Sequence, residues 1–261
     1  MMVYIRWIPK YAVLFFSLIT IICFHNRVFG QERVITAGFQ YKPLFSSKFF
    51  KTGPQELIWN AKYYDTIPQL IYQDSAFFKI SPESGYCIGM VIRAGLSDTW
   101  SLETGINFVR RNYQLDMSDS TGSESTDFSL VSYQIPVQAL VFIQLSDQVF
   151  MDVSMGVAAD FYPSDIATYG DRFIHSSARL SWLSASLLAN IGWEYRTTES
   201  GYFYLGASYN RPFNSIMRSF FKRPTTDYGP EEYIDLKGNY LTVDLRYFFH
   251  SDPVKRKSKK R

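Results

Sequence analysis

The most regular feature of the sequence is an alternation of apolar and polar residues that recurs along most of its length. In residues 129–145 the odd positions from Val131 to Leu145 are all apolar or aromatic, and the even positions include several Ser and Gln residues. Successive side chains of a β-strand point to opposite faces. Each such segment therefore predicts a strand with one apolar face and one polar face. No stretch beyond the first 30 residues shows a convincing helical period.

Eight segments share this pattern, and most have the roughly 9–11 residues that a tilted strand needs to cross a bilayer. The predicted strands are 33–43, 85–96, 100–115, 129–145, 148–161, 180–196, 201–211 and 239–249. Tight connections alternate strictly with long ones, which are 44–84, 116–128, 162–179 and 212–238. Transmembrane barrels show this asymmetry, with the tight turns in the periplasm. The sequence therefore predicts an all-β fold: an eight-stranded antiparallel up-and-down transmembrane β-barrel with periplasmic termini.

The composition of the polar faces indicates whether these faces point into the barrel or away from it. A soluble secreted barrel also alternates, but its apolar face is inside and its charges are outside. Here the polar faces mix Gly, Ser, Asn and Gln with few ions, as expected for a crowded interior in which charges must be paired. The residues predicted to form ion pairs inside the barrel are Arg93, Glu103, Asp152, Glu194, Arg196, Asp244 and Arg246.

The apolar faces carry aromatic residues near the strand ends. Aromatic girdles at both membrane interfaces are typical of a lipid-facing surface. The predicted interface aromatics are Tyr86, Trp100, Trp193, Tyr195, Phe203, Tyr247 and Phe249. Together with the loop asymmetry, they favour the membrane barrel over a soluble barrel or sandwich, which remains the alternative.

The first 30 residues have the features of a signal peptide. Arg6 and Lys10 precede an apolar run at 11–23, which is shorter than the roughly 20 residues of a membrane anchor helix. Cleavage after Gly30 leaves the barrel at 31–249 and a basic tail at 250–261, either solvated or touching anionic head groups or cell-wall polymers. Without the leader the basic and acidic residues balance, so no nucleic-acid partner is expected.

Only one cysteine, Cys87, remains after the predicted leader. An intramolecular disulfide is therefore excluded and a cysteine-based metal site is disfavoured. We expect no cofactor, no metal and no catalytic residue. Glu103 and Asp152 could be imagined as a catalytic carboxylate pair, but no substrate pocket is evident. Their pairing inside the barrel is the simpler interpretation.

The long connections hold the remaining information. The segments 44–84 and 212–238 are rich in aromatic residues, which argues against plain disorder. They could pack on one another over the barrel mouth, extend the strands beyond the membrane, or bind a partner. The Ser/Thr/Asp-rich stretch 117–128 reads as a solvated loop tip. His175 and Ser177 fall in another long connection, where a solvated histidine beside serines is the expected state.

Three segments carry a resemblance to a known family: 133–137 (YQIPV), 201–206 (GYFYLG) and 240–249 (YLTVDLRYFF). They resemble the outer-membrane β-barrel domain family of Bacteroidota, which is similar in architecture to small OmpA- and OmpX-like barrels and includes the PorT-like proteins. The resemblance implies the fold, the bacterial outer membrane, and assembly by the outer-membrane insertion machinery. A terminal strand ending in Phe resembles the sorting signal of that machinery, but here residues follow Phe249.

Three functions fit these observations. The leading one is a non-enzymatic envelope protein whose long outer loops contact lipopolysaccharide or an envelope protein partner, while the barrel contacts outer-membrane lipid. The second is a narrow pore or an accessory barrel of a secretion system, as the PorT-like resemblance allows. The third is a lipid A-modifying hydrolase, because His175-x-Ser177 resembles the His and Ser of the lipid A deacylase barrels; a serine nucleophile needs such a base.

Overall fold

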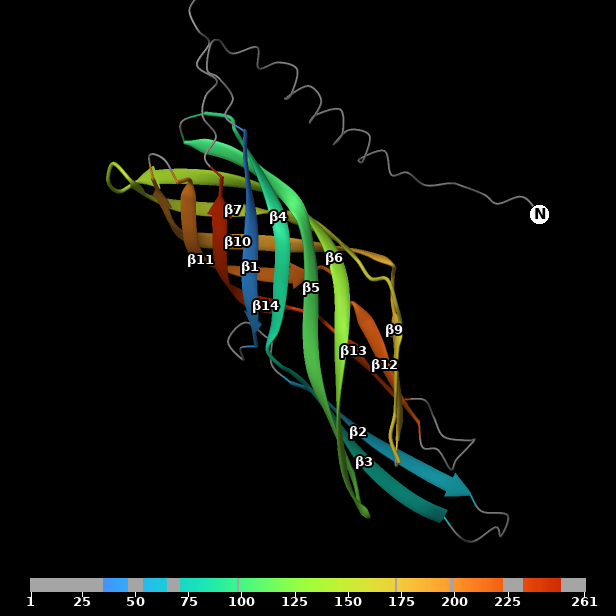
Figure 1. Cartoon of the computed structure of the whole chain (residues 1–261). Coiled ribbons are helices and arrows are strands. Elements are labelled where there is room, and N and C mark those ends of the chain that lie inside the picture. The colour runs from blue at the N-terminus through green and yellow to red at the C-terminus, as the bar shows by residue number, and fades with distance from the viewer. Residues whose placement is uncertain are drawn as a thin grey trace, which may run out of the picture. The chain divides into compact units, whose positions relative to one another are not determined.

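The computed structural model describes residues 35–46, 54–64, 71–97, 99–171, 173–197, 200–222 and 232–249. Across these residues the chain forms antiparallel β-strands (Figure 1). None of the described residues belongs to a helix long and apolar enough to span a bilayer. The predicted signal peptide 1–30 and basic tail 250–261 lie outside the described residues.

Eight strands form a closed ring. Each pairs with its two neighbours, in the order β1-β4-β5-β6-β7-β10-β11-β14, and β14 returns to β1. Their bounds are β1 (Ile35–Phe45), β4 (Gly85–Gly95), β5 (Trp100–Asp119), β6 (Gly122–Gln144), β7 (Val149–Phe161), β10 (Leu183–Arg196), β11 (Tyr202–Pro212) and β14 (Tyr240–Phe248). The predicted eight-stranded up-and-down topology is confirmed, with strand ends that differ by a few residues.

The apolar face of each ring strand points outward. In β10, Ile191, Trp193 and Tyr195 are exposed on the outer wall, whereas Asn190 and Glu194 on the opposite face of the strand are buried in the lumen. The same phase holds around the ring: the inside contains most of the polar residues together with two small apolar clusters, and large hydrophobic residues cover the outside. This arrangement is the reverse of a soluble barrel and matches a wall that faces lipid.

Two ring strands continue well beyond the others. β5 and β6 remain paired up to the turn between Asp119 and Gly122, so 117–128 is the end of a β-hairpin. The prediction of a loop is wrong here, whereas the exposed tip at Ser120 and Thr121 agrees with it. The alternation was misleading here because the apolar residues change from the outward face to the inward face along the strand. Outward Ile106 is followed at the same face by Arg110 and Gln114, while inward Asn107 gives way to Leu115.

The other three long connections form strands as well. They are β2 (Gln55–Tyr64), β3 (Ile71–Pro82), β8 (Ile166–Tyr169), β9 (Ile174–Arg179), β12 (Met217–Lys222) and β13 (Glu232–Leu236). β2 and β3 add to the extended part of β5, and the remaining four form a second sheet, ordered β13-β12-β9-β8. We call these six strands and the extension of β5 and β6 the cap; Figure 1 shows it gathered at one end of the ring.

The two sheets of the cap enclose a common hydrophobic core. Its buried members are Ala76, Phe78, Ile80, Tyr113, Leu115, Met117, Phe128, Leu130, Tyr162, Phe173, Ile216, Met217, Phe221, Ile234 and Leu236. Side chains connect the sheet edges: Gln55 donates to the carbonyl of Asp235 at 2.9 Å, and the amide of Asp171 donates to Glu124 at 3.0 Å. The long connections therefore both extend the barrel and pack on one another, two of the three expectations.

Candidate functional site

Arg93 on β4 lies at the centre of an ion-pair layer inside the lumen. Its guanidinium contacts Glu103 on β5 at 3.2 Å and Asp152 on β7 at 3.7 Å, and it pairs closely with Glu194 on β10. The strand alternation puts all four side chains on the inner face, and the ring brings them to one level. Asp152 accepts no hydrogen bond within the described residues, so Arg93 is its ion-pair partner.

Arg246 on β14 extends this layer across the lumen. It contacts Glu103 at 2.6 Å and Asp244, two residues earlier on its own strand, at 2.7 Å. At the rim, the half-buried Arg196 contacts Glu194 at 2.6 Å. The structure thus places all seven residues predicted as interior ion pairs in one connected network.

Three further charged residues of the lumen were not among the predicted ion pairs. Lys42 on β1 contacts Asp244 at 2.8 Å, Arg111 on β5 donates to Ser132 at 2.7 Å, and Asp160 on β7 accepts from Gln134 at 2.8 Å. Lys42 follows the inward phase of Thr36 and Gln40, so the alternation could have found it. Arg111 lies where the phase inverts, which conceals its direction.

The charges of the lumen cancel. Over the described residues, five basic side chains face five acidic ones across the lumen: Lys42, Arg93, Arg111, Arg196 and Arg246 against Glu103, Asp152, Asp160, Glu194 and Asp244. Burying an unpaired charge is costly, and a balanced set avoids that cost without an external counter-ion. The formal charges of the lumen therefore balance among the chain's own described residues.

Large side chains fill the rest of the lumen. On the cap side, Arg111 lies over the ring of Tyr240 at 4.8 Å, and the ring of Tyr162 is 5.9 Å away. Near the ion-pair layer, the Tyr204 ring covers Gly192 and Gly206, where an added Cβ would strike it. Between these levels lies a cavity of about 20 Å³ that Lys42, Cys87, Asn107, Gln134 and Tyr240 help to line, which is room for about one water molecule.

The outer wall carries two groups of paired aromatic rings. At the ends next to the tight turns, Phe39 contacts Phe249 and Tyr247 contacts Phe203, with ring centroids 5.6 and 5.0 Å apart. Nearer the cap, Phe108 lies between Tyr86 and Tyr133, at 6.2 and 5.9 Å. Of the predicted interface aromatics, Trp100, Trp193, Tyr195, Phe203 and Phe249 are exposed on the wall, and Tyr86 and Tyr247 are partly exposed.

His175 is buried, so the expectation of a solvated loop histidine is wrong. β9 directs it into the cap core between the rings of Phe128 and Phe221. Its Nδ1 hydrogen-bonds Thr168 and its Nε2 hydrogen-bonds Ser177, both at 2.9 Å. Burial away from water lowers the pKa of His175 to about 4. The imidazole is therefore neutral at physiological pH.

Ser177 shares the buried position of His175. Its hydroxyl hydrogen-bonds Ser219 at 2.6 Å, and all three side chains are essentially inaccessible to solvent. Among the described residues no carboxylate contacts the imidazole. No group of three or more potential metal ligands occurs in the described part of the chain either.

A closed ring with an apolar outer wall, aromatic girdles and a charge-balanced interior defines the class of outer-membrane β-barrels. Residues 59–218, more than half of the chain, match the family described as outer membrane protein beta-barrel domain, and the chain belongs to it. The protein is accordingly one of the bacterial outer membrane. No curated protein matches the sequence.

Solved structures of outer-membrane barrels are also similar to this chain. OprG from Pseudomonas aeruginosa matches at 13% identity and a TM-score of 0.47, over 84% of this chain and 96% of its own. The outer membrane protease OmpT from Escherichia coli matches at 11% identity and a TM-score of 0.38, over 84% and 99%. The translocator domain of the autotransporter NalP from Neisseria meningitidis matches at 13% and 0.34, over 92% and 96%.

Proposed function

We propose that this protein is a non-enzymatic envelope protein with a sealed lumen, whose cap projects from the cell surface and contacts lipopolysaccharide or a protein partner. The observation that carries the proposal is the connected, charge-balanced ion-pair layer around Arg93 and Arg246. An eight-stranded ring is only wide enough for its own side chains to fill it. Here they fill it at three levels, and on this basis we expect no continuous path for a solute.

Cys87 offers a direct test of the sealed lumen. It is buried, borders the small lumen cavity and is the single cysteine after the predicted leader. In reconstituted vesicles, a membrane-impermeant thiol reagent should leave Cys87 unlabelled while it labels a Ser146→Cys control in a tight turn. Planar-bilayer recording of the same protein should show no sustained conductance. Labelling of Cys87 together with steady current would favour the narrow-pore alternative instead.

The cap is the proposed contact surface because it is built as a folded unit. Its strands come from all four long connections and share one hydrophobic core, so a binding face on it would be preorganised. We also infer that both termini are periplasmic, that the insertion machinery assembles the barrel, and that the chain is one of the PorT-like proteins of Bacteroidota. The tight turns and the long cap connections support the orientation.

The orientation is testable with two matched epitope tags. One tag is inserted at Thr121, at the tip of the β5–β6 hairpin, and the other between Ser146 and Asp147 in a tight turn. Antibody should bind intact cells that carry the first tag and should reach the second only after permeabilisation. The opposite pattern would place the cap in the periplasm and overturn its proposed role at the surface.

The hydrolase alternative has one geometric point in its favour, the 2.9 Å contact between His175 and Ser177. Both side chains, however, point into the cap core and are shielded by Phe128 and Phe221. We therefore assign them a structural role. Lipid A mass spectra of cells with wild-type protein and with Ser177→Ala should be identical, and a difference would revive the enzyme.

A further inference from the structure

A hollow of about 790 Å³ lies on the lipid-facing wall beside the tight turns. Side chains of β1, β10, β11 and β14 form most of it, with Ile88 of β4 and Val149 of β7 at its edges. Its volume is within the range of about 300–1,000 Å³ that ligand pockets occupy. Because a barrel wall is convex, this concavity must come from the side chains that rise around it.

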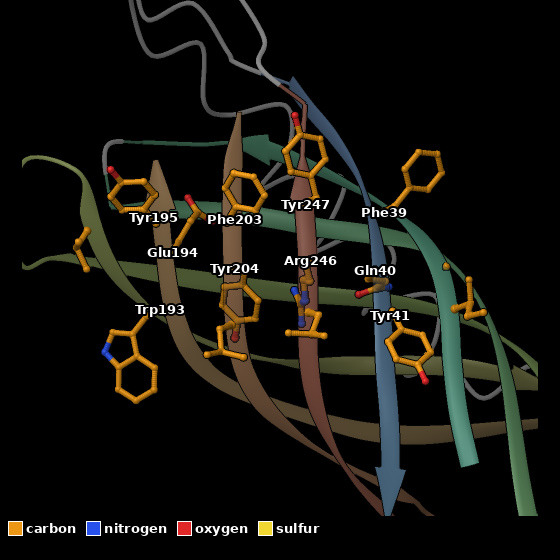
Figure 2. A pocket seen from close by; sticks show the side chains of 15 residues that line it. Phe39, Gln40, Tyr41, Trp193, Glu194, Tyr195, Phe203, Tyr204, Arg246 and Tyr247 are labelled. Carbon is orange, nitrogen blue, oxygen red and sulfur yellow. The ribbon is translucent and has the colours of Figure 1, made fainter. Parts of the chain in front are cut away.

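The strand register explains the shape of the hollow. One row across the wall is wholly aromatic: Phe39 pairs with Tyr247, Tyr247 with Phe203, and Phe203 with Tyr195. The next row runs Tyr41, Leu245, Leu205 and Trp193, so large rings stand at its ends and leucines lie in its middle. Figure 2 shows the aromatic row and the two flanking rings, Tyr41 and Trp193.

The row after that lies outside the lining of the hollow and has smaller residues in its middle. Leu205 and Leu245 are followed on their strands by the outward residues Ala207 and Val243, which pair with each other. Ring–leucine–alanine steps therefore descend from the tight turns toward the centre of the bilayer. The lining of the hollow extends over six strands, so an extended apolar group fits it better than a compact one.

Hydrogen bonds fix the depth of the aromatic row. The Tyr195 hydroxyl donates to Gln148 at 2.9 Å, and the Tyr247 hydroxyl donates to the carbonyl of Ser200. Both acceptors belong to the tight turns that leave the membrane. Tyrosines with an apolar ring and a hydroxyl at the polar edge are typical of the head-group level. The hollow thus begins at that level and extends into the acyl layer.

The lining presents an occupant with a surface that is almost entirely apolar. Glu194, Arg246 and Gln40 border the hollow, but their side chains are buried on the lumen side. What faces the hollow is the set of exposed rings and leucines described above. The Tyr41 hydroxyl and the Trp193 indole N–H stand at its two ends, and the surface between them is apolar. An occupant therefore needs apolar length above all, which describes an acyl chain.

A second copy of the chain fits this face less well. A two-fold interface sets the same patch against itself, so two hollows would face each other and enclose an empty space. Voids between packed surfaces forfeit dispersion contacts on both sides. A flexible chain can follow the steps of the surface and fill it.

We propose that the hollow between Tyr41 and Trp193 holds an acyl chain of a resident phospholipid. The assignment to the periplasmic leaflet rests on the proposed orientation of the barrel, whereas binding itself does not. The epitope tags test the orientation separately. A reversed orientation with intact binding would move the lipid to the other leaflet without removing the site.

Tryptophan quenching can test the resident lipid because the wall offers a matched control. Trp193 borders the hollow and is 54% exposed, while Trp100 is 50% exposed near a tight turn on another part of the wall. Two proteins are made, each keeping one of these tryptophans and carrying Phe at the other tryptophan positions. Each is placed in nanodiscs of phosphatidylethanolamine with increasing fractions of the chain-brominated form.

Brominated and unbrominated lipid bind the hollow equally, so a single resident chain predicts half-quenching of Trp193 at a brominated fraction of about one half, whereas Trp100, which meets several exchanging chains, reaches it at a fraction about two- to three-fold lower. Filling the hollow with Leu205→Phe and Leu245→Phe should bring the Trp193 curve onto that of Trp100. Ile135→Phe, on the wall outside the hollow, should leave it unchanged. Heat-modified gel mobility confirms that each variant is folded.

Two results would overturn the proposal. Coincident curves for Trp193 and Trp100 in the unfilled protein mean that the hollow has no preference over the general lipid shell. Protection of Trp193 from quenching, together with a dimer mass in the nanodisc, assigns the face to a second copy instead.

Discussion

Arg93 illustrates how much of this protein depends on single buried charges. Three carboxylates surround its guanidinium, but two of them have a second cation: Glu103 contacts Arg246, and Glu194 contacts Arg196. Asp152 has Arg93 at 3.7 Å and no hydrogen bond from the described residues. Loss of Arg93 would therefore leave Asp152 without its ion-pair partner, whereas Glu103 and Glu194 would each keep one.

Replacing Arg93 by Met should destabilise the barrel by about 3–5 kcal/mol, the usual cost of leaving one partner of a buried ion pair uncompensated. Urea unfolding in lipid vesicles, followed by the gel mobility of folded and unfolded forms, measures it. The double variant Arg93→Met, Asp152→Asn removes the stranded charge and should recover a substantial part of that loss. If both variants lose equal stability, Asp152 does not depend on Arg93.

His175 makes the cap sensitive to acid. Burial lowers its pKa to about 4, whereas an unfolded histidine titrates near 6.5. A group with a lowered pKa in the folded state binds its proton preferentially when unfolded. The contribution of neutral His175 to the stability of the cap is therefore complete above pH 6.5, and it declines as the pH falls from 6.5 toward 4.

Hydrogen exchange of the amides in β8, β9 and β12 should accelerate over that pH window beyond the intrinsic change in exchange rate. The limiting loss is about 3 kcal/mol, since each pKa unit corresponds to about 1.4 kcal/mol. A His175→Gln protein lacks the titration, and its protection should be flat across the window. An unchanged pH response in that variant would assign the effect to other groups.

At the scale of the elements, the ring was accessible to sequence reasoning and the cap was not. A strand such as β10 keeps one phase throughout, so its outward Trp193 and inward Glu194 can be recognised from alternation alone. β5 and β6 change phase in the middle because they leave lipid for water and gain an apolar core on the inside. A prediction that assumes one apolar–polar phase along the whole strand therefore assigns the end of the strand to a loop.

The short cap strands are hidden for a related reason. β12 alternates buried Met217, Ser219 and Phe221 with partly buried residues, and its inner face includes a serine that bonds Ser177. The position of His175 depended in the same way on partners from other connections. Such contacts arise only when distant loops meet. The ion pairs were easier to anticipate because the ring itself fixes where inward residues converge.

The change of apolar–polar phase along β5 predicts where this strand leaves the membrane on the cap side. Ile106 and Gln114 occupy the same outward face, but Ile106 is in the lipid-facing part and Gln114 is in the cap. Ile106→Arg should cost about 2–4 kcal/mol if it lies near the middle of the bilayer and less toward the interface. Gln114→Arg should be nearly neutral. Vesicle unfolding of the two variants compares them, and equal costs would place the boundary elsewhere.

At the scale of the whole molecule, the structure joins two bodies with different sources of stability, and β5 and β6 belong to both. Opening the ring would expose unpaired backbone groups to lipid, at several kcal/mol each. The cap is held by a hydrophobic core and by side-chain bridges such as Gln55–Asp235, with water available to its edges. Partial unfolding should therefore begin in the cap.

Moderate urea at neutral pH should consequently melt the cap while the ring persists. Hydrogen exchange resolved along β5 is the decisive measurement, since the strand belongs to both bodies: amides near Leu115 should lose protection at lower urea than amides near Ile106. Lowering the pH to about 5 should widen this difference in urea concentration, because protonation of His175 destabilises the cap alone. Simultaneous loss of protection along all of β5 would mean that cap and ring fold as one cooperative unit. In that case the cap could not rearrange on meeting a partner without opening the barrel beneath it.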